Sequence, residues 1–92
     1  MNSERAETIA LQALGWLAGN EELLPVFLGA SGATTDDLRS RATDQDFLAS
    51  VLDFLTMDDA WVVAFCDSAF LDYQEPMFAR QLLNGAREAH WT

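Results

Sequence analysis

Several carboxylates in this sequence have the residue types that acid–base catalysis or calcium binding requires. Glu21-Glu22 and Asp58-Asp59 are adjacent pairs. Adjacent residues on a helix point in different directions, so neither pair predicts the facing couple of a glycoside hydrolase. Asp44-Gln45-Asp46 begins like a calcium loop, but Phe-Leu-Ala follows where the loop needs a glycine and later a glutamate. We therefore expect neither kind of site.

The single cysteine and the single histidine are the next candidates. Cys66 lies within a helical apolar pattern, where no helix N-terminus or cation would lower the pKa of its thiol. A pair with His90, near the end of the sequence, stays open, but packing of Cys66 in the core is the favoured interpretation. One cysteine and one histidine are too few for a zinc site. We expect no catalytic residue, no metal and no cofactor.

The stretch Gly29-Ala30-Ser31-Gly32 has some of the character of a phosphate-binding loop. It lacks the Gly-Lys-Ser/Thr ending and has no strand before it. Termination of a helix is the better interpretation.

The charge balance limits the classes of partner. The 92 residues carry a net charge of −10, with 15 acidic residues against five arginines and no lysine. Phosphate contacts need clustered basic residues, so we expect no direct binding to nucleic acid or to a membrane. A single cysteine, apolar runs too short to span a bilayer and a start without a secretory pattern predict a cytoplasmic protein.

Apolar residues recur at helical spacing and predict one all-α domain over 1–92, a compact bundle of five to six short helices. Ser3 is expected to cap the first helix, and Gly19 to end it in the left-handed conformation. A second helix follows Asn20. The later helices are expected over 36–41 after a threonine cap, over 43–56, after Asp58, and over 76–84 with its end at Gly85.

The two halves of the chain resemble each other at an offset of 38 residues. Ile9 then aligns with Phe47, and the cap Asn20 aligns with the cap Asp58. We interpret this as two pseudo-repeats, about 5–41 and 43–84, followed by a tail over 85–92. Each unit alone would expose its apolar stripe, so the two are expected to pack face to face about a pseudo-twofold axis.

Most of the acidic residues fall at or just after predicted helix starts, where unpaired N–H groups and the helix dipole favour negative charge. This interpretation explains most of the acidity without a site. The ten residues are Glu4, Glu21, Glu22, Asp36, Asp37, Asp44, Asp46, Asp58, Asp59 and Glu75.

The run LGWLAGNEELLPVFLGASGATTDDLR, with FLASVLDFLTMDDAWVVAFCD after it, resembles a family of short acidic all-helical proteins of unknown function known mainly from alphaproteobacteria. The resemblance covers about Thr8 to Asp67, and its most specific part is Leu-Leu-x-x-Phe-Leu followed by Ser-Gly. It implies a helical fold and brings no reaction, ligand or catalytic residue.

The large apolar side chains exceed what a small core needs, so some are expected to contact a partner. The candidates are Trp61, Phe70, Leu71, Tyr73 and Trp91. The opposing interpretation is that the tail folds back on the core. The leading hypothesis is a non-enzymatic interaction or regulatory module that binds another protein or itself as a homodimer. The alternatives are an acidic decoy that mimics nucleic-acid charge and a small enzyme.

Overall fold

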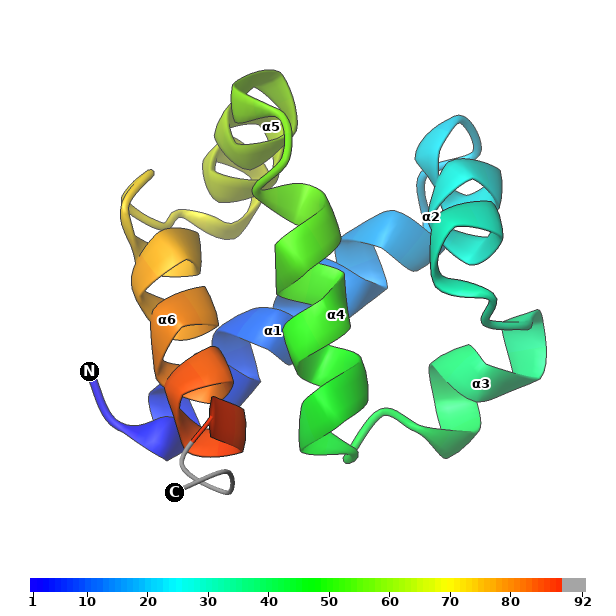
Figure 1. The fold of residues 1–92 in the computed structure, drawn as a ribbon. Coiled ribbons are helices and arrows are strands. Elements are labelled where there is room, and N and C mark those ends of the chain that lie inside the picture. The colour runs from blue at the N-terminus through cyan, green and yellow to red at the C-terminus, as the bar shows by residue number, and fades with distance from the viewer. Residues whose placement is uncertain (89–92) are drawn as a thin grey trace.

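The apolar spacing forms six α-helices within residues 1–88, the part of the chain that the computed structural model describes (Figure 1). This confirms the all-α fold and the helical bundle. No strand occurs in the described part. The helices are α1 (Ser3–Ala18), α2 (Leu23–Ser31), α3 (Thr35–Ser40), α4 (Gln45–Leu55), α5 (Asp59–Ala69) and α6 (Glu75–Glu88).

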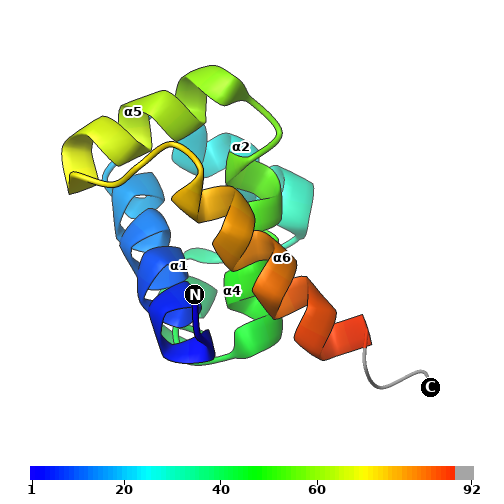
Figure 2. The same ribbon diagram turned by 90° about the vertical axis from the view of Figure 1, so that its left-hand side faces the viewer.

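Helices α1, α4 and α6 form the centre of the bundle and make the most extensive contacts with one another. Figure 2 shows α6 lying across α1 and α4, with α5 above them. Ala6, Ala10 and Ala13 on α1 and Ala79 on α6 are all fully buried. Because alanine adds little beyond the helix backbone, these positions allow the helices to approach closely.

Aromatic rings connect the outer helices to this centre. Phe27 attaches α2 to α4, because its ring lies edge-on to Phe47 at 6.0 Å and to Phe54 at 5.3 Å between centroids. The Phe65 ring of α5 lies edge-on to Trp16 of α1, at 6.0 Å. Helix α3 has no buried residue and lies to one side of the bundle (Figure 1).

Two predicted helix ends are wrong, and a third lies where predicted but has another backbone conformation. Asn2, not Ser3, caps α1, because Asn2 has the extended backbone of a cap and its Oδ1 accepts the Arg5 N–H at 2.8 Å. Gly19 ends α1 in the right-handed region, at φ −89°. Helix α6 continues past Gly85 to Glu88. A glycine inside a helix costs only about 1 kcal/mol, which the packing of α6 on two helices outweighs.

Two of the three helices in each half match at the 38-residue offset. Asn20 Oδ1 accepts from Leu23 N at 3.0 Å before α2, and Asp58 Oδ1 accepts from Ala60 N at 2.8 Å before α5. The third helices differ, since α3 has six residues and lies outside, whereas α6 has 14 and belongs to the centre. The pseudo-twofold arrangement stays a prediction.

Candidate functional site

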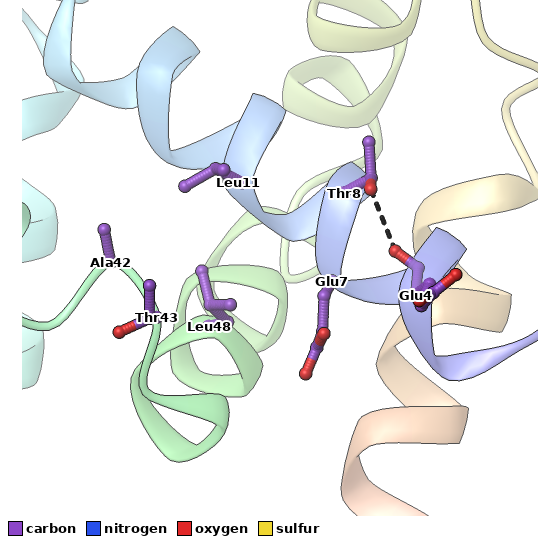
Figure 3. A pocket seen from close by; sticks show the side chains of 7 residues that line it. All are labelled: Glu4, Glu7, Thr8, Leu11, Ala42, Thr43 and Leu48. Atoms are coloured by element: carbon purple, nitrogen blue, oxygen red, sulfur yellow. Dashed lines mark hydrogen bonds between the residues drawn. The ribbon is translucent and has the colours of Figure 1, made fainter.

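A shallow hollow of about 420 Å³ lies between α1 and the segment that joins α3 to α4. Figure 3 shows Leu11 and Leu48 together with Ala42 at its apolar end, and Glu4 and Glu7 at the other. Thr43 and Thr8 complete its lining.

Two of the polar groups that line this hollow have partners within the fold. The Glu7 carboxylate accepts a hydrogen bond from Gln45 Nε2 at 2.7 Å, and the Thr8 hydroxyl donates to the Glu4 carbonyl at 2.9 Å (Figure 3). No cysteine, histidine or cation lines it in the described part of the chain. The hollow therefore does not combine a thiol or an imidazole with its carboxylates.

Cys66 is fully buried, as predicted. Burial raises the pKa of its thiol, and the carboxylates of Glu75, Asp67 and Asp72 raise it further. The thiol also donates to the Asp72 carbonyl, with Sγ 3.5 Å from the oxygen. A thiol that stays protonated and enclosed is a poor nucleophile. His90 lies outside the described residues.

The structure places eight of the ten acidic residues predicted there at helix starts. Asp44 and Asp58 are N-caps, and Glu4, Asp36, Asp37, Asp46, Asp59 and Glu75 lie in first turns. Glu21 and Glu22 lie in the turn before α2. Among the described residues, no group of three potential ligands could hold a metal ion, and no helix combines the length and hydropathy needed to cross a bilayer.

The predicted surface residues divide into two groups. Trp61 and Leu71 are half-buried against the core, and the Trp61 ring stacks on Phe54 at 4.9 Å between centroids. Phe70 and Tyr73 are exposed in residues 70–74, which join α5 to α6 and are called the Phe70 turn below. Trp91 lies outside the described residues.

Phe70 combines an unusual backbone with almost complete exposure. Its φ of 58° and ψ of 45° are left-handed, and it is the one non-glycine residue with positive φ in the described chain. Its N–H donates to the Cys66 carbonyl, as does that of Leu71, so the turn closes α5. This position normally holds glycine or asparagine, because a β carbon costs roughly 1–2 kcal/mol there. The side chain of Phe70 is 95% exposed.

Tyr73 connects the Phe70 turn to the exposed side of α5. Its hydroxyl donates to Asp67 Oδ1 at 2.8 Å, and this hydrogen bond raises the pKa of the phenol. The contact holds the half-exposed ring beside the last turns of α5. Phe70 and Tyr73 therefore extend the surface of that helix.

Sequence reasoning missed the exposed side of α5 itself. Phe65 and Cys66 are its fully buried residues, and the opposite side is open. We call this the α5 outer face, and its exposed residues are Asp59, Ala60, Val63, Ala64, Asp67 and Ser68. The signal was present in the spacing, since Val63 lies two positions before the buried Phe65 and so points away from that ring.

Glu75 fixes the far end of the Phe70 turn. Its carboxylate accepts the Asp72 N–H at 2.9 Å and pairs with Arg5 at 3.2 Å, and the two contacts lower its pKa. Because the pKa of Glu75 is lowered by folding, its charge stabilises the fold at pH values above the ordinary pKa of glutamate. This contribution is lost as the pH falls through the pKa of Glu75 in the folded state.

We expect Glu75→Gln to lower the free energy of unfolding by less than about 1 kcal/mol near neutral pH, because the pair is exposed. The difference from the parent protein should vanish in acid, where Glu75 itself is protonated. Urea unfolding at about pH 7 and at successively lower pH, until the folded-state Glu75 is protonated, measures the difference. A difference that stays constant throughout would show that the charge of Glu75 contributes nothing.

These features define the chain as a helical bundle whose α5 is covered on one side only and ends in an exposed aromatic turn. The chain belongs to DUF3572, a family of proteins of unknown function, and the match covers residues 3–86. This confirms the resemblance to an uncharacterised family and extends it over most of α6. The alphaproteobacterial source stays a prediction. No curated protein and no solved structure matches the chain.

Proposed function

We propose that this protein is an interaction module without catalytic activity, and that the Phe70 turn is the centre of its contact surface. The observation that carries the proposal is the conformation of Phe70, which is left-handed and 95% exposed. The side chain adds almost no buried area to the fold. The backbone at the same position would be more stable with glycine.

A residue that costs the fold stability and contributes no packing is a candidate for function. Exposed aromatic side chains are the groups that partners most often bury, since they supply large contact area with few rotatable bonds. The proposal therefore explains why phenylalanine, and not glycine, occupies residue 70.

Other features support the same class of protein. The enclosed Cys66 thiol supports a role without catalysis, as do the hydrogen bonds that Glu7 and Thr8 already make in the hollow beside α1. A lone cysteine held as a thiol supports a reducing cytoplasm. The acidic decoy stays an alternative, but helix starts already account for eight of the 15 acidic residues.

Two substitutions at residue 70 separate the ring from the backbone. We expect Phe70→Gly to raise the free energy of unfolding by about 0.5–1 kcal/mol, because it relieves the left-handed strain at some cost in chain entropy. Phe70→Ala keeps the strain and removes only exposed atoms, so its stability should stay within about 0.5 kcal/mol of the parent. Urea unfolding followed by circular dichroism measures both.

Both variants should lose the proteins that the tagged parent captures from its native cells. Met57→Ala is the matched control, because Met57 is 78% exposed just before the opposite end of α5. That variant should capture the same proteins as the parent. Capture unchanged by either Phe70 variant would contradict the proposed function.

A further inference from the structure

The α5 outer face consists of two neighbouring stripes of side chains. Asp59, Val63 and Asp67 follow one another at intervals of four residues, and Ala60, Ala64 and Ser68 form the second stripe at the same spacing. All six are exposed. The helix is about 16 Å long, and its exposed side chains are short apart from Val63 and the two carboxylates. Phe70 and Tyr73 stand at its C-terminal end.

The charge on this surface is of one sign. Asp59 and Asp67 lie on the α5 outer face, and Asp72 lies in the Phe70 turn. No arginine forms an ion pair with these three carboxylates within residues 1–85, whose side chains the structure describes. Three of the arginines are instead paired elsewhere: Arg5 with Glu75, Arg41 with Asp44 and Arg80 with Asp53. A partner that neutralised this surface would have to supply the positive charge itself.

A second copy of the chain is a poor occupant of the surface. A symmetric dimer places the same patch on both sides of the contact, so the aspartates of each copy would face those of the other. Each copy also carries a net charge of −10. Like charges brought together in an interface cost several kcal/mol. The charge therefore favours a different, basic protein.

The shape of the surface favours a helical partner. The backbone N–H and C=O groups of α5 are used inside the helix, so an extended strand would find no free sheet edge to pair with. Short side chains along α5 let another helix lie close beside it. An amphipathic helix could place apolar residues against Val63 and Phe70 and basic residues beside the aspartates.

We propose that the partner of this surface is a cationic amphipathic helix of another protein, which lies along the α5 outer face and buries Phe70. This step rests on the proposed function and names the chemical class of its partner. Apolar contact with Phe70 supplies affinity. The aspartates of the surface supply selectivity for a helix with basic residues on both sides of its apolar stripe.

A synthetic amphipathic peptide of about 18 residues, or five helical turns, provides the probe. It carries leucine at helical spacing and lysine or arginine on both flanks, with a fluorophore for anisotropy measurements on the full chain. We expect saturable binding that weakens about tenfold or more in Phe70→Ala and about threefold in Asp67→Asn. Raised salt should also weaken it. The same peptide with glutamate at the basic positions should not bind.

Asp36→Asn is the matched control for charge, because it removes the same single charge from the exposed first turn of α3. Its affinity for the cationic peptide should equal that of the parent. Equal losses in Asp36→Asn and Asp67→Asn would overturn the proposal, since they would indicate general attraction to an acidic protein. Absent binding of the cationic peptide would overturn it as well.

Two further results distinguish this inference from the proposed function. A dimer seen by light scattering and abolished by Phe70→Ala would identify a second copy as the occupant, and the cationic helix would be wrong. The other result is a cellular partner whose capture depends on Phe70 but is not reduced by the cationic peptide. It would support the proposed interaction module and overturn only the proposed class of partner.

Discussion

Phe27→Ala should lower the free energy of unfolding by about 3–5 kcal/mol, the range for removal of a buried aromatic ring. Phe27 is fully buried, and its ring contacts two aromatic rings of α4. The substitution would leave a cavity between α2 and α4. Because a domain of this size has a free energy of unfolding of only about 5–15 kcal/mol, the variant should be only marginally stable.

Urea unfolding followed by circular dichroism and by tryptophan fluorescence measures this loss. Phe27→Leu is the control, because it keeps most of the apolar volume and should cost clearly less than the alanine variant. A loss below about 1 kcal/mol for Phe27→Ala would show that α2 is not anchored through this ring.

Leu83→Ala should cost about 2–5 kcal/mol, because Leu83 is 2% exposed on α6 in the centre of the bundle. Global unfolding should be affected, since α6 contacts both α1 and α4. The midpoint of urea unfolding reports the loss. An unchanged slope of the free energy of unfolding against urea concentration would show that the transition stays two-state.

Leu38→Ala, on the third helix of the first half, supplies the comparison. Leu38 is only half-buried, so its truncation should cost about 1 kcal/mol. Two equivalent halves would give similar losses at α3 and α6. Equal costs for Leu38→Ala and Leu83→Ala would contradict the unequal roles that the packing assigns to these helices.

The helices were predictable because their apolar spacing and their caps agree. Phe47, Val51 and Phe54 follow the α4 stripe and are all buried. Thr34 caps α3 in a capping box with Asp37, and Asp58 caps α5, as the residue types indicate. Where tertiary packing outweighs local preference, prediction was wrong, as at Gly85 inside α6.

The candidate surface was only partly predictable. Phe70 and Tyr73 were named as candidates because the large apolar side chains exceed what a small core needs. No glycine or asparagine marks the left-handed turn at residue 70, so its conformation had no sequence signal. Trp61 was grouped with them, although its ring stacks on Phe54 and the residue is partly buried against the core. Exposure of α5 depends on how few helices pack against it, which one sequence does not specify.

The enclosed position of Cys66 gives the molecule a built-in reporter of its own opening. A thiol reagent can reach this sulfur only when α5 or the Phe70 turn moves away from its neighbours, and the sequence holds no second cysteine to confuse the signal. The rate of alkylation therefore reports how often the structure opens around Cys66. A ligand bound to the α5 outer face would stabilise the closed state and slow the alkylation. Thiol labelling could thus follow occupancy of that face without any engineered probe.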